Sequence, residues 1–172
     1  MGFQEVEVEQ LSLNPFTAIG EQWMLVSAGD EEKCNTMTAS WGGMGVLWGM
    51  PTVTVYLRPQ RYTRTFVEAK GLFTVSFLGE EHREALAYCG RVSGREVPVK
   101  IEAAGLTPYY VDGTTAIEEA ELVLVCRTIY SDEMPPENFV MKEADERWYP
   151  EHDYHRMFIG QIVRALRKEQ ED

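Results

Sequence analysis

The sequence predicts a mainly β protein, an antiparallel barrel with a few short helices. Short runs in which apolar and polar residues alternate recur along the chain, as in strands that bury one face. Turn residues separate these runs, and only two segments have helical character. The chain of 172 residues suits one domain, residues 1–172, with a single core. Closing the sheet into a barrel would remove its exposed strand edges.

In the first third of the chain, the pattern predicts strands joined by tight turns. Residues 5–13 alternate enough for a short strand or an arm, and residues 23–28 and 33–40 predict a hairpin. Residues 42–45, GGMG, predict a flexible turn, because glycine tolerates unusual backbone dihedrals. Residues 52–57, TVTVYL, predict a core strand buried on one face.

Two helices are predicted around the next strand. The first begins near Thr63, a good N-cap residue, after a turn at Pro59. Residues 73–78 predict a strand, and residues 80–88 predict the second helix because apolar residues recur among charges.

The second half contains two strand patterns and a region without a pattern. Residues 117–129 predict one long strand, with odd- and even-numbered side chains on opposite faces. Residues 130–155 are acidic and aromatic, contain three prolines and show no period, which predicts a long irregular insertion. Such an insertion is typical of a lid or a partner-binding loop. Residues 157–166 predict the last strand, followed by a charged tail that we expect to be frayed.

Composition excludes several classes of function. The formal charge of −12 disfavours general nucleic-acid binding, and no apolar run approaches the ~20 residues of a membrane helix. The three cysteines, Cys34, Cys89 and Cys126, form no C-x-x-C pair, which fits a reducing cytoplasm and argues against zinc. The acidic N-terminal residues do not resemble a secretory signal. We therefore expect a cytoplasmic protein without a membrane or nucleic-acid partner.

The stretch from residue 34 to residue 66 has the features of a ligand site. Residues 35–41 are small and hydroxylated, so a strand end here would present backbone N–H groups and short donors. Arg58, Arg61 and Arg64 follow closely in an acidic chain. With the N-terminal amides of the predicted helix they would form an anion site, and phosphate is the commonest occupant. The alternative is a solvated basic turn.

Six sequence blocks resemble the flavin reductase-like family, FMN-binding split-barrel proteins that include the flavoredoxins. In order, they are NTMTASW at 35–41, PTVTVYLRPQRYT at 51–63, FTVSFL at 73–78, YCGRVSGRE at 88–96, GLTP at 105–108 and YHRMFIGQI at 154–162. They cover most of the chain. The resemblance implies an antiparallel Greek-key split barrel with FMN as cofactor.

The resemblance also implies which residues hold FMN. Arg58, Arg61 and Thr63 would help with the phosphate, and Tyr62 would also contact the cofactor. The ribityl chain and the ring would be lined by the residues of the first block: Asn35, Thr36, Met37, Thr38, Ser40 and Trp41. Lys100, placed by counting back from GLTP, would contact the flavin, unless it is a surface lysine.

His155 is the one candidate catalytic residue. The resemblance places it near the flavin, where it would hydrogen-bond the cofactor or the nicotinamide donor. The alternative is a structural histidine at the start of a strand. A metal pair with His152 is disfavoured, because a spacing of three in an extended segment directs the two imidazoles to opposite sides.

The implied function is that of an NAD(P)H:flavin oxidoreductase, which passes electrons from NADH or NADPH through FMN to free flavin or an electron-acceptor protein. A flavoredoxin-like carrier reduced by a partner protein and a non-enzymatic flavin- or haem-binding module stay open. The chain has no G-x-G-x-x-G motif before a helix, so the sequence does not identify the donor.

The resemblance implies a homodimer, because in this family two chains usually associate with the flavin near their interface. Four tryptophans and eight methionines are compatible with an apolar dimer face, although such residues are more often part of the core.

Overall fold

The computed structural model describes residues 2–169 and is dominated by one eight-stranded antiparallel sheet. The strands follow the order β3-β2-β6-β9-β10-β5-β4, and β1 also pairs with β10. Their bounds are β1 (Phe3–Val6), β2 (Met24–Gly29), β3 (Cys34–Ala39), β4 (Gly42–Leu47), β5 (Met50–Leu57), β6 (Leu72–Phe77), β9 (Leu122–Glu133) and β10 (Arg156–Lys168). A separate hairpin joins β7 (Pro108–Val111) and β8 (Thr114–Ile117). The predicted fold class, mainly antiparallel β with a few short helices, is confirmed.

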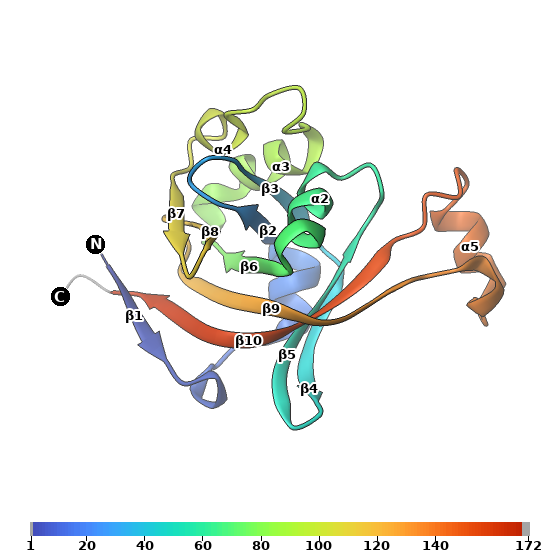
Figure 1. Cartoon of the computed structure of the whole chain (residues 1–172), viewed down its shortest axis with the longest axis horizontal. Coiled ribbons are helices and arrows are strands. Elements are labelled where there is room, and N and C mark those ends of the chain that lie inside the picture. Colours follow the sequence, from blue (N-terminus) through green and yellow to red (C-terminus); the bar gives the residue numbers. More distant parts are fainter. Residues whose placement is uncertain (1, 170–172) are drawn as a thin grey trace.

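The helices are short. They are α1 (Pro15–Thr17), α2 (Tyr62–Lys70), α3 (Arg83–Arg91), α4 (Lys100–Ala103) and α5 (Lys142–Trp148), with single turns at Val8–Gln10, Ala18–Gln22, Glu80–His82 and Pro136–Asn138. In Figure 1, α2, α3 and α4 lie around β2 and β3. The strands β9 and β10 run side by side across the molecule, with α5 near one end and both termini near the other.

The longest strand, β10, joins three neighbours. It pairs with β9 along most of its length, while residues 156–161 pair with β5 and residues 165–168 pair with β1. Its register against β9 shifts after Ile159 and again after Ile162. Between these shifts, a Cβ added at Gly160 would lie only 2.5 Å from Cζ of Phe73. Gly160 therefore allows the buried Phe73 ring to pack directly on the backbone of β10.

Apolar side chains fill both faces of the sheet. On β9, Leu124 and Cys126 pack into one cluster with Phe73 and Phe158, while Val125 packs into a second cluster that includes Leu86 and Ile117. The predicted alternation along this strand is thus confirmed. Both faces are buried over residues 122–126, and β9 is a central strand because it pairs with β6 on one edge and with β10 on the other.

The prediction of a flexible turn at residues 42–45 is wrong. These glycines belong to β4, and the chain reverses at Trp48 and Gly49, whose φ angles are 52° and 74°. A Cβ at Gly42 would lie 2.7 Å from the carbonyl oxygen of Thr54. Glycine at this position permits close strand packing and does not make a turn.

The predicted N-cap at Thr63 is also wrong. The helix α2 begins at Tyr62, and Arg61 occupies the N-cap position without a side-chain hydrogen bond to the helix. Thr63 instead lies buried inside the first turn, where its hydroxyl accepts a hydrogen bond from Asn35 Nδ2 at 2.9 Å.

Two predicted boundaries in the second half are wrong. Residues 117–129 do not form one strand, because Ile117 ends β8 and β9 begins only at Leu122. The intervening carboxylate of Glu119 accepts hydrogen bonds from the backbone and hydroxyl of Thr107, which fixes a turn. The region 130–155 is not irregular throughout, because β9 continues to Glu133 and residues 142–148 form α5. Residues 170–172 of the tail that we expect to be frayed lie outside the described residues.

Candidate cofactor site

A cavity of about 260 Å³ lies where β3, β5, the residue preceding β10 and the end of α5 meet. Seven residues of the predicted site line it: Met37, Thr38, Ser40, Trp41, Arg58, Arg61 and His155. Ala39, Tyr56 and Trp148 complete the wall. The structure therefore brings the small hydroxylated motif, two of the arginines and the histidine to one place.

The strand β3 supplies the backbone of this wall. It lies at one end of the strand order, so only its β2 side carries a ladder in the described part of the chain. On its other side, Lys100 Nζ donates to the carbonyl oxygen of Thr36 at 2.7 Å, and the hydroxyl of Thr38 donates to the carbonyl oxygen of Leu86 in α3. A strand with one side free of a ladder can offer backbone groups to a ligand.

Three predicted site residues lie beneath the cavity and do not line it. Asn35 donates to Thr63, and the hydroxyl of Thr36 lies 2.8 Å from that of Ser27. A Cβ at Gly94 would lie 2.1 Å from Oδ1 of Asn35, so the loop before α4 packs directly over this amide. These buried contacts hold β3, α2 and the loop together below the site.

Tyr62, Lys100 and also Asn35 line a neighbouring depression of about 490 Å³. The guanidinium of Arg95 lies 4.6 Å from the centre of the Tyr62 ring, and Lys33 Nζ lies 5.5 Å from it. Lys100 is only 2% exposed, so the surface alternative for this lysine is wrong. Burial lowers the pKa of Lys100 to about 8.

The two arginines of the cavity differ in their electrostatic surroundings. Arg58 forms an ion pair of 2.8 Å with Asp153 and donates to the carbonyl oxygen of Trp148, so its charge holds the segment after α5. Arg61 instead donates to the carbonyl oxygen of Gly90 at 2.8 Å, and no described carboxylate lies within ion-pair distance of it. Its guanidinium is therefore bonded to carbonyl oxygens and is not paired with a described carboxylate, and burial lowers its pKa.

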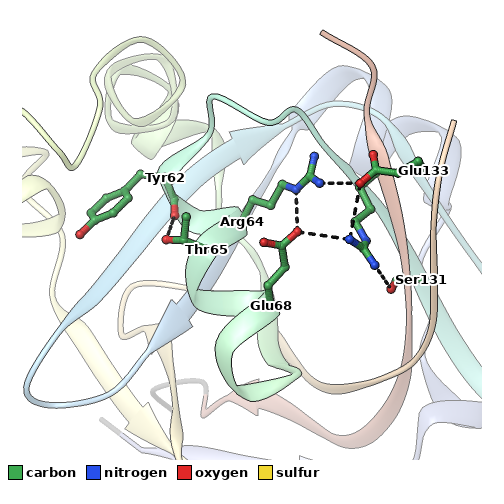
Figure 2. Close-up of polar contacts among 7 residues, drawn as sticks. Tyr62, Arg64, Thr65, Glu68, Ser131 and Glu133 are labelled. Carbon is green, nitrogen blue, oxygen red and sulfur yellow. Dashed lines mark hydrogen bonds and ion pairs between the residues drawn. The ribbon is translucent and has the colours of Figure 1, made fainter. Parts of the chain in front are cut away.

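Arg64, the third arginine of the predicted anion site, points elsewhere. Figure 2 shows its guanidinium directed away from Tyr62 and toward Glu68 and Glu133, to which it pairs at 2.8 and 2.7 Å. Arg156 approaches the same two carboxylates at 3.6 and 3.5 Å. This network ties α2 to the adjoining ends of β9 and β10 and leaves Arg64 unavailable for an anion at the cavity.

Arg95 is the basic residue that the sequence reasoning missed. Its Nη1 donates to the carbonyl oxygen of Gln60 at 2.9 Å, which places it beside the start of α2. Like Arg61, it has no described carboxylate partner within ion-pair distance. The only sequence signal for it was its place in the YCGRVSGRE block. Glu31, Glu32 and Glu102 line the same depression as Arg95 without pairing to it. Two guanidinium groups without a carboxylate partner beside the N-terminus of a nine-residue helix favour an anion.

His155 is held by an aromatic cluster at the opposite wall. Its Nδ1 lies 2.7 Å from the hydroxyl of Tyr149, and its ring lies 5.3 Å from that of Trp41, which in turn meets Trp148 edge-on at 5.0 Å. Burial, and then the charge of Arg58, lower the pKa of His155 to about 4, while burial raises the pKa of Tyr149. The imidazole is therefore neutral at neutral pH and can accept the phenol hydrogen at Nδ1; in that tautomer its own proton is on Nε2.

The buried histidine predicts a pH dependence of stability. Because its folded-state pKa is lowered from 6.5 to about 4, the neutral form stabilises the fold above pH 6.5, and this contribution is lost as the pH falls toward 4. Urea unfolding at several pH values should show that, between pH 6.5 and about 4, the free energy of unfolding falls more steeply for the native protein than for His155→Gln. Parallel curves for the two proteins would contradict the burial of a neutral His155.

Residues 2–169 contain neither a cluster of metal-ligand residues nor a helix suited to crossing a membrane. This part of the chain holds no group of three or more His, Cys, Asp or Glu residues that could bind a metal ion. None of its helices is long and apolar enough to cross a membrane.

Comparison with known proteins links the chain to flavin chemistry. The family model described as the flavin reductase like domain matches residues 16–172. No curated protein matches the chain. Solved structures share its fold: a flavoredoxin from Methanosarcina acetivorans has 24% identity and a TM-score of 0.69, with coverage of 95% of this chain and 77% of that one. The flavoredoxin of Desulfovibrio vulgaris (Miyazaki F) has 21% identity and a TM-score of 0.67, covering 96% and 78%.

A nicotinamide-dependent enzyme shares the fold too. The NADH:FAD oxidoreductase of Streptomyces globisporus C-1027, solved in complex with NAD and FAD fragments, has 17% identity and a TM-score of 0.63. The alignment covers 86% of this chain and 75% of that one.

Proposed function

The chain belongs to the flavin reductase-like family, and from this premise we propose that it is an FMN-binding oxidoreductase. In this proposal it takes electrons from NADH or NADPH and passes them to free flavin or to an electron-acceptor protein. The observation that carries it is a pair of guanidinium groups at the start of α2 that have no described carboxylate partner: Arg61 lines the cavity beside β3, and Arg95 lines the neighbouring depression.

The residues present fit FMN. A flat ring requires an aromatic and backbone-lined cavity, which Trp41, Trp148 and the free side of β3 supply. A phosphate dianion requires cations without carboxylate partners, and Arg61, Arg95 and the helix N-terminus meet this need. Bound FMN would accept a hydride from the nicotinamide and pass the electrons on.

The remaining residues position groups around the cofactor. Arg61 and Arg95 would bind the phosphate, while Arg58 keeps the end of α5 against the cavity through Asp153. His155 would donate a hydrogen bond from Nε2–H to the cofactor or to the nicotinamide. Because its pKa is about 4, it would act at neutral pH as a donor and not as a proton source.

Quaternary structure and location complete the proposal. Exposed apolar side chains on the β4–β5 hairpin and beside α5 support a homodimer: Val46, Trp48, Val140 and Met141. The three cysteines are free thiols, which supports a reducing cytoplasm.

A flavoredoxin-like carrier, with tightly bound FMN reduced by a partner protein, is the second candidate. The structural similarity to two flavoredoxins favours it. It differs from the first candidate in its electron donor and not in its cofactor.

An anaerobic absorbance experiment separates the two candidates. We expect the purified protein, reconstituted with FMN, to be yellow and to bleach when NADH or NADPH is added. A flavin that stays oxidised with both donors would favour the carrier. A folded protein that cannot be reconstituted with FMN would contradict both.

A further inference from the structure

A second, larger cavity opens beside the candidate flavin cavity. It measures about 680 Å³ and is bounded by α1 and the turn after it, by β4 and by the segment around α5. Ser40, Trp41, Tyr56 and Trp148 line both cavities. The larger cavity, which we call the apolar groove, therefore continues directly from the wall of the flavin cavity, and its volume lies in the range of small-molecule sites.

The lining of the apolar groove is uncharged. The residues that belong to it alone are Pro15, Phe16, Ile19, Gly20, Gly42, Gly43, Met44, Met134, Phe139, Ala144 and Tyr149. In a chain with 26% charged residues, fifteen lining residues would on average include about four charged ones, and here there are none. An ion in this groove would lose hydration without gaining a counter-charge, whereas a flat apolar molecule would gain contact area.

Three residues of the groove carry hydroxyl groups: Ser40, Tyr56 and Tyr149. The hydroxyl of Tyr149 already lies 2.7 Å from Nδ1 of His155. Ser40 and Tyr56 line both cavities, and a hydroxyl can donate to a carbonyl oxygen. Aromatic side chains of Phe16, Phe139 and Trp148 offer faces and edges for a planar ring. Hydroxyl donors and aromatic walls together suit a conjugated ring that carries a carbonyl group.

We propose that the apolar groove binds an uncharged, planar carbonyl compound of the quinone class, as the electron acceptor. Its role as acceptor rests on the proposed function. The net reaction balances: NADH or NADPH gives a hydride, solvent gives one proton, and the quinone becomes a hydroquinone with two electrons and two protons added. A nicotinamide dinucleotide, with its phosphates, does not match the uncharged lining.

The test compares two probes of the same shape and different charge. Calorimetry measures binding of dimethylnaphthoquinone, whose ring has no free position for a thiol to attack, and of methylnaphthoquinone sulfonate, its anionic counterpart. Both are titrated into the FMN-reconstituted protein and into the flavin-free chain. We expect the uncharged quinone to bind at least about tenfold more tightly, because the groove has no counter-charge.

Two variants locate the binding. Phe16 is 86% exposed and lines the groove, so Phe16→Arg adds a charge there without filling the core. Val163 in β10 is 39% exposed and does not line the groove, so Val163→Arg is the matched control. We expect Phe16→Arg to weaken binding of the uncharged quinone by about tenfold or more and to reduce the ratio of its affinity to that of the sulfonate. The FMN affinity of this variant, and the quinone affinity of the control variant, should stay within about twofold of the native values.

Three results would overturn the proposal. One is that the sulfonate binds the native protein as tightly as the uncharged quinone. Another is that neither probe binds a protein that holds FMN. The third is that Phe16→Arg leaves quinone binding unchanged but converts a dimer to a monomer in gel filtration, which would assign the groove to a second copy of the chain. Quinone binding with the expected preference in a protein that cannot hold FMN would support the groove and defeat the proposed function.

Discussion

Arg61→Ala is expected to weaken FMN binding by roughly ten- to a hundredfold, because a hydrogen bond to a charged group contributes about 1.5–3 kcal/mol. The guanidinium of Arg61 has carbonyl partners and no described carboxylate partner, so its charge is available to a dianion. Riboflavin lacks the phosphate, and its affinity should fall far less. Flavin fluorescence titrations of the two ligands against each protein give the comparison.

Two further proteins make this test specific. Arg61→Lys retains the positive charge but loses the two parallel N–H donors of the guanidinium. Its affinity for FMN should therefore lie between that of the native protein and that of Arg61→Ala. Arg91→Ala removes an exposed arginine from the end of α3 and should leave both affinities unchanged. Arg61 also donates to the carbonyl oxygen of Gly90, so an equal loss for FMN and riboflavin would show that it only supports α3.

Gly160→Ala is expected to destabilise the protein by about 1–3 kcal/mol, because the added methyl group overpacks the core. Its Cβ would lie 2.5 Å from Cζ of Phe73 and 2.9 Å from Cβ of Cys126. Thermal unfolding should show a lower melting temperature, by about 2–4 °C for each kcal/mol lost in a chain of this size. Gly43→Ala is the matched control, because a Cβ at Gly43 in β4 meets nothing within 4 Å.

A double-mutant cycle identifies the cause of that loss. Phe73→Leu shortens the side chain that the new methyl group meets, so Gly160→Ala should cost less in the Phe73→Leu background than in the native one. Additive effects would place the origin of the destabilisation in the backbone of β10 and not in the contact with Phe73.

Much of the sheet could be predicted from the sequence because short β-prone runs between turn residues mark strands, whether one face or both faces are buried. The strands at residues 23–28, 33–40, 52–57 and 73–78 correspond to β2, β3, β5 and β6. The prediction of a turn at residues 42–45 was wrong because glycine, which lacks a Cβ, is suited both to turns and to close contacts between strands. The packing of Gly42 against Thr54 is visible only once the hairpin is formed.

Part of the candidate site could be predicted because its residues lie in the sequence blocks that resemble the family. The cavity gathers Met37 to Trp41, Arg61 and His155, all of which lie in blocks that resemble the family. Asn35 and Thr63 are small polar residues whose local pattern does not tell which side of the strand or helix they face, and they bond to each other in the interior. The ion-pair partner of a charged side chain can come from a distant segment of the chain. The pairing of Arg58 with Asp153 therefore cannot be predicted from the residues around Arg58.

The pairing of β1 with β10 bears on how the protein can be handled. Residues 165–168 of β10 are covered on one side by β9 and on the other by residues 3–6 alone. Without β1, this stretch would expose a row of unpaired N–H and C=O groups, which can template pairing with another molecule. A bulky fusion partner joined directly ahead of Phe3 would crowd this short strand, so a flexible spacer there protects the purified protein from aggregation.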